Sequence, residues 1–201
     1  MSIRVKAIIG ALGICIGAAA AAGLVAYFAM VKSSYEFDRM AVEVGEKHTQ
    51  TAIKDISSRV SSYADLVALN PAVVEAVAEN NRANMERVFV ALTERLKKND
   101  PTIAVVEASD KSGRIVIRGH NPARHGDDKS KEPGFSVALK GTGYTAMTIS
   151  PTTGEAAIVS MRPLKDAKGD VIGAINVGAR LRDATAQEIK TATGLDVVFM
   201  V

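Results

Sequence analysis

Tryptophan is absent from the sequence, and aromatic residues together make up 4% of its 201 residues. The core must therefore be built from aliphatic side chains and methionine. Hydrophobic residues account for 47% of the chain and charged residues for 23%, which is ordinary for a globular protein and argues against wholesale disorder. The length allows one domain and a tethering segment.

Cysteine is nearly absent as well. The single cysteine, Cys15, lies inside an apolar segment, so the rest of the chain has no thiol. This excludes disulfides, cysteine-ligated zinc and covalently attached haem outside that segment. The bulky residue before Cys15 and the long apolar run after it argue against a lipid-modified cysteine.

Neither sign of charge is in large excess. The formal net charge is +3, and two of the cations, Arg4 and Lys6, precede the apolar segment. The remainder is close to balance, so we expect no nucleic-acid partner and no polybasic membrane patch.

Motifs that carry catalytic chemistry are missing. The sequence contains no Gly-x-Ser-x-Gly, phosphate-loop or dinucleotide fingerprint. His48, His120 and His125 lack the spacing of a helical metal site. The adjacent carboxylates Asp127 and Asp128 are expected to solvate a loop. We therefore expect no enzymatic activity, no metal and no cofactor.

An uncharged run rich in Ala, Gly, Ile and Leu extends from Ala7 to Met30. As a helix it would be roughly 36 Å long, enough to cross a hydrocarbon core of about 30 Å. A cleaved signal peptide is the alternative, because residues 18–22 are small, but the run is longer than a typical signal-peptide core. Arg4 and Lys6 predict that residues 1–6 are cytoplasmic and that the chain after the transmembrane helix is extracytoplasmic.

A long helix is predicted over residues 32–69, where proline is absent. Apolar and small residues recur there at intervals of three or four, as on one face of a helix. The members of this stripe are Val42, Gly45, Thr49, Ala52, Ile56, Val60, Tyr63 and Val67. The stripe either packs on a sheet or, in its membrane-proximal part, pairs with a second copy of the chain. We expect a homodimer through this helix. Asn70-Pro71 ends it, and helices follow within residues 71–98.

From residue 102 to 201 the pattern changes to short apolar runs separated by polar turns. The clearest hairpins have turns at 110–113 and 166–169, and further strands are predicted at 144–149 and 195–201. Short helices are predicted at 135–140 and 184–192. The fold class is therefore α+β: a transmembrane helix, a long helix, then an antiparallel sheet of about five to six strands flanked by helices.

Basic and amide side chains gather where the second strand ends, namely Arg118, His120, Asn121 and Arg124. Strand alternation predicts that Ile115 and Ile117 share the face toward the long helix, and that Arg118 points to the other face, beneath the loop 120–132. The planar fork of arginine suits a carboxylate, because it donates two parallel hydrogen bonds. The alternative is that these side chains are simply solvated.

The order of these elements resembles a known family. The segments VVEASDKSGRIVIRGHNPARHGDD, SVALKG and MRPLKDAKGDVIGAINVG follow a long helix, as in the Cache-type, PAS-like extracytoplasmic sensor domains of bacterial methyl-accepting chemotaxis proteins and sensor histidine kinases. The resemblance covers most of residues 32–201, and it is closest to single Cache domains of citrate and dicarboxylate sensors or to the first module of a double Cache domain. It implies a PAS-like sheet in a periplasmic domain anchored in the inner membrane.

The resemblance also implies ligand contacts. In the acid sensors the second strand ends with an arginine, two intervening residues and a His-Pro pair. Here one residue separates Arg118 from His120, and Asn121 separates His120 from the proline. The implied candidate residues are Arg118, His120, Asn121, Arg124, Arg162 and Asn176.

The third core strand departs from the family. Met161 and Val159 stand where the acid sensors have basic residues, two and four positions before a proline, and Arg162 directly precedes Pro163. Ser160 and Asn176 are either pocket or sheet residues. Without these basic residues, a smaller monocarboxylate or another small metabolite is as well supported as a di- or tricarboxylate. The ligand is therefore expected to be an organic acid or other small anion.

The resulting hypothesis is a membrane-anchored sensor domain that transmits a signal across the membrane, in chemotaxis or two-component signalling. Because the sequence ends on an apolar run, DVVFMV, we expect it to be a fragment of a longer receptor. The alternative is a membrane-anchored binding or scaffold protein without signalling output.

Overall fold

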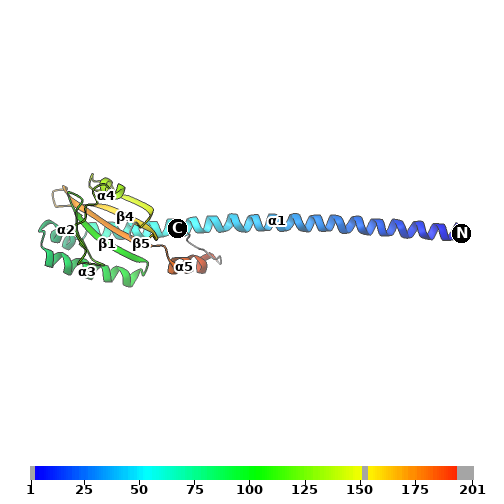
Figure 1. The fold of residues 1–201 in the computed structure, drawn as a ribbon, viewed down its shortest axis with the longest axis horizontal. Helices are drawn as coiled ribbons and strands as arrows, with labels where there is room; N and C mark the ends of the chain where they lie inside the picture. Colours follow the sequence, from blue (N-terminus) through cyan, green and yellow to red (C-terminus); the bar gives the residue numbers. More distant parts are fainter. Residues whose placement is uncertain (1–2, 151–153, 194–201) are drawn as a thin grey trace. The chain divides into compact units, whose positions relative to one another are not determined.

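The computed structural model describes residues 3–150 and 154–193 (Figure 1). The chain divides into two compact units, residues 1–48 and 49–201. The helices are α1 (Ile3–Ala68), α2 (Pro71–Ala78), α3 (Arg82–Asn99), α4 (Pro133–Ala138) and α5 (Asp183–Thr193). The strands are β1 (Ile103–Asp110), β2 (Ile115–Arg118), β3 (Tyr144–Ile149), β4 (Ala156–Lys165) and β5 (Val171–Arg180).

The first unit is helical. The predicted segments 7–30 and 32–69 lie in one helix, α1, which ends at Ala68, one residue before the predicted end. Large apolar side chains are exposed in the described part of this unit, as Tyr35 and Val42 are at 73% and 72%. Across the part of the chain that the structure describes, none of the helices has the length and apolar character needed to span a membrane.

The breaks between the helices lie where the sequence predicts them. Asn70 precedes Pro71, and its side-chain oxygen accepts a hydrogen bond from the Ala72 backbone N–H at 3.0 Å. Asn81 caps α3 in the same way, by accepting from the Asn84 backbone N–H at 3.1 Å. Each cap satisfies a donor that the first helical turn would leave unpaired.

The sheet is antiparallel and has the order β2-β1-β5-β4-β3. Both predicted hairpins are present, and their turns share one chemistry. Asp110 and Asp166 each accept two backbone N–H groups within their turns, and Gly113 and Gly169 take φ values of +85° and +88°, which glycine adopts readily. The strand predicted at 195–201 lies outside the described residues. The described elements confirm the α+β, PAS-like fold class.

One face of the sheet packs against α1, α2 and α3. Its aliphatic side chains form a single core with those of the three helices. The predicted stripe of α1 is buried in its second half, where Ile56, Val60 and Val67 are at most 2% exposed. This part of the helix therefore packs against the sheet as part of the main hydrophobic core.

The other face of the sheet carries a smaller apolar cluster, in which α4 contributes Phe135 and β4 contributes Met161. Ile115 belongs to this cluster, so the prediction that it shares a face with Ile117 is wrong. Ala108 pairs with Ile117 but the next residue, Ser109, pairs with Ile115, which leaves one extra residue in β2. This β-bulge turns the two isoleucines to opposite faces.

We predict that Gly119→Ala destabilises the domain strongly. A Cβ at this position would collide with the Thr93 hydroxyl and the backbone carbonyl of Phe89, because β2 ends directly against α3. We expect a loss of about 3 kcal/mol in the free energy of unfolding, measured in urea. Gly126→Ala meets open space and carries only the strain of a φ of +94°, so it should cost about 1 kcal/mol. Equal losses would contradict this packing.

Candidate functional site

A buried carboxylate lies at the centre of the sheet face that α4 covers. Glu107, in the middle of β1, is 2% exposed. In the sheet register it lies between Arg118 of β2 and Asn176 of β5. Side chains directly opposite one another in a sheet point to the same face, so these three polar groups converge there.

Every contact to Glu107 comes from a different element. Arg118 Nε donates to Oε2 at 2.8 Å, and Asn176 Nδ2 donates to Oε1 at 2.9 Å. Lys129, in the loop between β2 and α4, places Nζ 3.1 Å from Oε1. Burial by itself raises the pKa of the Glu107 carboxyl, but these contacts outweigh it and hold the pKa below its usual range. Glu107 is therefore a buried, ionised group.

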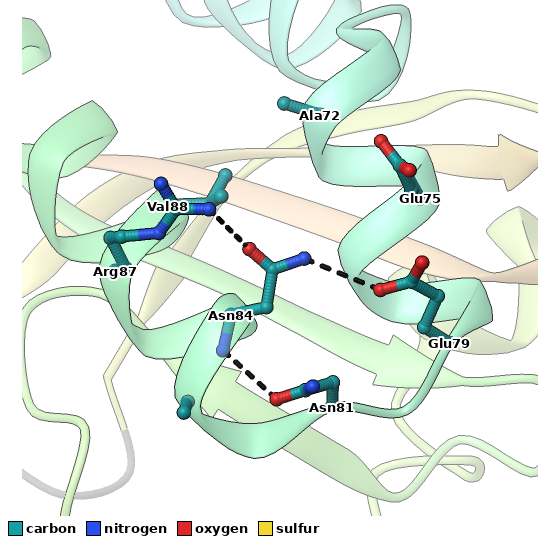
Figure 2. Close-up of a pocket in the computed structure, with 8 residues that line it drawn as sticks. Ala72, Glu75, Glu79, Asn81, Asn84, Arg87 and Val88 are labelled. Atoms are coloured by element: carbon teal, nitrogen blue, oxygen red, sulfur yellow. Dashed lines mark hydrogen bonds between the residues drawn. The ribbon is translucent and has the colours of Figure 1, made fainter.

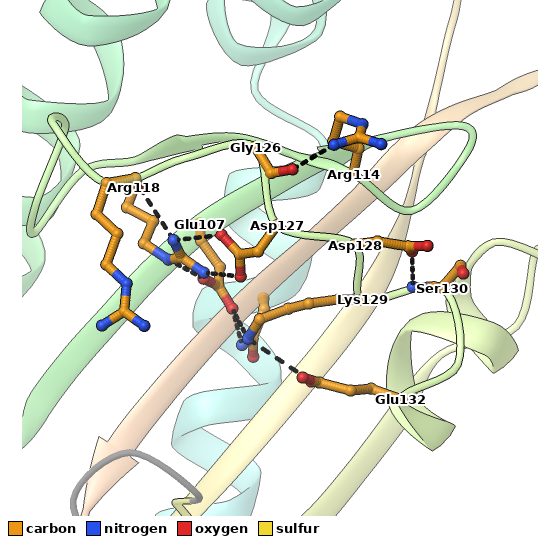
Figure 3. Close-up of polar contacts among 11 residues, drawn as sticks. Glu107, Arg114, Arg118, Gly126, Asp127, Asp128, Lys129, Ser130 and Glu132 are labelled. Carbon is orange, nitrogen blue, oxygen red and sulfur yellow. Dashed lines mark hydrogen bonds and ion pairs between the residues drawn. The ribbon is translucent and has the colours of Figure 1, made fainter.

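The guanidinium of Arg118 is occupied from both sides (Figure 3). Its two terminal nitrogens donate to the two carboxylate oxygens of Asp127, at 2.8 and 2.6 Å, and one of them also donates to the backbone carbonyl of Arg124 at 3.0 Å. This bidentate contact lowers the pKa of the Asp127 carboxyl from 3.8 to about 2. Asp127, expected to solvate the loop, thus holds the buried arginine instead.

The loop reaches the site because a short part of it pairs with the edge of β2. The N–H of Ile115 donates to the carbonyl of Asp127 at 2.9 Å, and the N–H of Lys129 donates to the carbonyl of Gly113 at 2.9 Å. In an extended segment alternate side chains share a face. Asp127 and Lys129 therefore both point at the sheet, whereas Asp128 is exposed and bonds the Ser130 backbone N–H.

The ammonium of Lys129 has a second charged partner and an aromatic one. It lies 3.6 Å from a carboxylate oxygen of Glu132 and 5.5 Å from the centre of the Phe135 ring. A cation above an aromatic face is attracted by the ring quadrupole. The Glu132 carboxylate and the Phe135 ring therefore both favour an ammonium group at this position.

Two buried polar atoms on this face have no hydrogen-bond partner among the residues that the structure describes. They are Ser109 Oγ and Asn176 Oδ1, and their residues are 0% and 4% exposed. Ser109 follows Glu107 by two positions, so it lies on the same face. Buried polar atoms are nearly always paired, and both of these can accept a hydrogen bond. Both are therefore acceptors to which the described residues supply no donor.

The predicted site residues are only partly brought together. Arg118 and Asn176 meet at Glu107, and Arg124 contributes its backbone carbonyl while its side chain is exposed. Asn121 is exposed as well. His120 is half-buried, and its Nδ1 accepts from the Val106 backbone N–H at 3.4 Å; burial lowers the pKa of its imidazole.

Arg162 lies on the opposite face of the sheet. Its Nε donates to Asp65 of α1 at 2.5 Å, and its guanidinium also bonds the Ser61 hydroxyl of the same helix. Ser160 is on this face too, 2.9 Å from the Thr145 hydroxyl. The structure therefore does not bring Arg162 to the Glu107 cluster.

Three residues of the cluster were missed by the sequence reasoning: Glu107, Asp127 and Lys129. The signal for Glu107 was a lone acidic residue within the apolar run VVEAS. Asp127 and Lys129 are two apart, which matches the alternation of a strand, but the loop around them gave no other sign of pairing with β2.

Two open hollows lie elsewhere on the domain. One, of about 530 Å³, is between α2 and α3, and Figure 2 shows that Asn84 in its wall bonds Asn81, Glu79 and Arg87. The other, of about 960 Å³, lies beside Arg162 and the β4–β5 turn. Among the described residues, the unpartnered Ser109 and Asn176 atoms line neither hollow.

Comparison with known proteins agrees with this fold. Residues 41–201 match the dCache_3 family, described as the double sensory domain of two-component sensor kinase. No curated protein sequence matches the chain.

Solved structures that are similar to this chain include the following sensor and ligand-binding domains. The Escherichia coli DcuS sensor domain has a TM-score of 0.57 and 16% identity, over 70% of this chain and 98% of that one. The sensor domain of the Vibrio cholerae histidine kinase DctB has a TM-score of 0.63 and 16% identity, over 77% of this chain and 61% of that one. The ligand-binding domain of the Campylobacter jejuni chemoreceptor Tlp3, solved with L-valine, has a TM-score of 0.53 and 12% identity, over 80% of this chain and 66% of that one.

We predict that Glu107→Gln destabilises the domain by about 3–5 kcal/mol, because Arg118 and Lys129 lose the buried carboxylate that they share and keep only their more exposed partners, Asp127 and Glu132. The matched control is Glu188→Gln, which breaks a contact with Arg59 between side chains that are 46% and 38% exposed. An exposed pair of this kind is worth about 0–1 kcal/mol. Urea unfolding of both variants would test this, and similar losses would show that Glu107 contributes no more than a surface pair.

The contact of Asp127 with Arg118 predicts an acid-sensitive component of stability. Because the folded pKa is depressed, to about 2 from 3.8, this component is present above about pH 4 and is lost as the pH falls toward 2. Melting temperatures of the wild type and of Asp127→Asn should therefore differ at pH 6 and converge between pH 4 and 2. A difference that stays constant across this range would refute the assignment.

Proposed function

The chain belongs to the dCache_3 family, the double sensory domain of two-component sensor kinases, and on this basis we propose that it is the ligand-sensing part of a membrane receptor. The receptor would serve two-component signalling or chemotaxis, since the similar DctB and Tlp3 domains belong to a histidine kinase and a chemoreceptor. As part of such a receptor, the chain would bind a small molecule without transforming it. The chain spans about 61% of the DctB sensor domain.

We place the ligand on the sheet face of β1, β2 and β5, beneath the loop 119–132. The observation that carries this proposal is the pair of buried, unpartnered acceptors, Ser109 Oγ and Asn176 Oδ1, beside the charged groups of Glu107 and Arg118. Convergent polar groups on a buried face provide what a small-molecule site needs for orientation and specificity.

The proposed ligand is a small organic acid or another small molecule with an anionic group, and its carboxylate would bind Arg118. That this guanidinium already holds the Asp127 carboxylate bidentately supports the assignment. His120, Asn121 and Arg124 would contact the ligand from the loop, after the loop has adjusted. Asn176 would orient it from β5.

The signal would pass to α1. Arg162 of β4 holds Asp65 and Ser61 of this helix, so a shift of the sheet changes the contacts of the helix directly. A ligand biases the two states only by binding one of them better, and a preference of about 1–3 kcal/mol is typical of such coupling.

Membrane anchoring is proposed from the sequence. The uncharged run 7–30 would cross the inner membrane with residues 1–6 in the cytoplasm, which places the sensing unit outside it. A homodimer through α1 is proposed for the membrane-proximal stripe, where Val42 is exposed in the single chain.

A thermal-shift screen of the purified chain in detergent tests the proposed function. At about 100 times its dissociation constant, a ligand adds about 2.7 kcal/mol, which raises the melting temperature by about 5–11 °C. We expect one small organic acid or amino acid to do so, and Arg118→Lys to abolish the shift because lysine lacks the planar fork.

Arg114→Lys is the matched control, since Arg114 is exposed and its guanidinium donates to the backbone carbonyl of Gly126 in the same loop. A shift that survives Arg118→Lys would place the ligand elsewhere. A protein that melts cooperatively and that no compound stabilises would support the alternative, a membrane-anchored scaffold.

A further inference from the structure

The charges of the loop match those of the sheet one to one. The sheet presents a guanidinium on Arg118 next to a carboxylate on Glu107, joined at 2.8 Å. From the loop, the carboxylate of Asp127 contacts the Arg118 guanidinium, and the ammonium of Lys129 contacts the Glu107 carboxylate. Figure 3 shows both loop side chains reaching toward the sheet pair.

We propose that Asp127 and Lys129 are a built-in substitute for the ligand: they occupy the places of the carboxylate and the ammonium of a small zwitterion, such as an α-amino acid, and the ligand binds by displacing them. This inference rests on the proposed function. It adds the chemical class of the ligand and the competition that controls its access.

The difference in burial between the two pairs shows which one moves. The side chains of Glu107 and Arg118 are 2% and 7% exposed and lie on paired strands. Those of Lys129 and Asp127 are 21% and 44% exposed and reach the site from a loop. The loop groups are therefore the ones that a ligand can replace, when its own charged groups meet Arg118 and Glu107, while the sheet groups stay in place.

The hydrogen-bond count favours an ammonium ligand over the lysine now in place. An ammonium has three donors. Lys129 directs its donors to Glu107 and to Glu132 at the surface, which leaves Ser109 Oγ and Asn176 Oδ1 without a donor. A ligand ammonium is not tied to a loop, so it can satisfy acceptors that the lysine does not reach.

Charge balance favours a ligand that carries both signs of charge. When the loop leaves, one negative and one positive group leave together, and the sheet retains Arg118 and Glu107. A zwitterion restores the same balance. A mono- or dicarboxylate would replace Asp127 at Arg118 but would not replace Lys129, so Glu107 would keep only Arg118 and Asn176 as partners.

The test uses two charge-conserving double variants of the full chain. Asp127→Asn with Lys129→Met removes the substitute, and each sheet group keeps a partner: Arg118 keeps Glu107, and Glu107 keeps Asn176. Asp128→Asn with Lys131→Met makes the same changes on neighbouring residues, both exposed, that do not contact the sheet pair.

The probes are matched sets: L-alanine with propionate and ethylamine, and L-leucine with 4-methylpentanoate and 3-methylbutylamine. We expect an amino acid to bind the first variant about tenfold tighter than the wild type, if the substitute occupies the site about 90% of the time. The control variant should bind like the wild type, and the acids and amines should not bind. Weaker binding to the first variant, or equal binding of an acid or amine, would overturn the inference.

A second measurement on the wild type needs no variant. The carboxyl of Asp127 titrates at about 2 while it holds Arg118, against 3.8 when free. Carbon-13 NMR should show this pKa return toward 3.8 when a saturating amino acid is added, and an unchanged pKa in the bound protein would overturn displacement. If only an organic acid binds through Arg118, the inference fails and the proposed function stands. If no compound binds either protein, both fail.

Discussion

An ionised carboxylate inside the sheet is the constraint on which the arrangement of this domain depends. Glu107 has almost no contact with water, so its charge must be met by protein groups, and each of these comes from a different part of the chain: Arg118 from β2, Asn176 from β5 and Lys129 from the loop. Leaving such a charge unmet would cost several kcal/mol, more than a marginally stable domain can lose easily. One side chain therefore holds the first hairpin, the central strand and the loop in register with one another.

The two faces of the sheet differ in character, one aliphatic and one polar, and the β-bulge in β2 contributes to this difference. Toward α1, α2 and α3 the sheet is aliphatic and tightly packed, so it behaves as one rigid layer with the helices. Toward α4 it carries charges and unpartnered acceptors. The extra residue in β2 lets that short strand place Ile117 in the core and Ile115 beside Phe135, with Arg118 on the polar face. On the helical side, Arg162 ties β4 to α1, so a rearrangement on the polar face has a direct contact through which to reach that helix.

Local patterns in the sequence predicted most of the fold, because each depends on neighbouring residues. The Asp-x-x-Gly turns predicted both hairpins, Asn70-Pro71 predicted the helix break, and the helical stripe predicted the burial of Ile56 and Val60. The resemblance to Cache-type sensors is confirmed by the family match of residues 41–201. The bulge in β2 was not visible, because it depends on pairing with β1, and strand alternation alone then misplaced Ile115. The role of Asp127 was missed for the same reason: its contact with Arg118 exists only because a loop without strand character pairs with a sheet edge.

In a sensor that buries opposite charges, these charges also need partners when no ligand is bound. Arg118 and Glu107 on an open face would need water molecules or other partners. An empty site with unmet charges has a high free energy, so it would bind its ligand too tightly to report a changing concentration. Loop groups that meet the same charges lower the free energy of the empty state, and they bring it close to that of the bound state. The two states then differ in the position of the loop more than in the number of satisfied charges, so a ligand with modest differential affinity can shift the population between them. The proposed displacement would also account for the partial exposure of the loop groups and the burial of the sheet groups, because it needs one fixed pair and one pair that can leave.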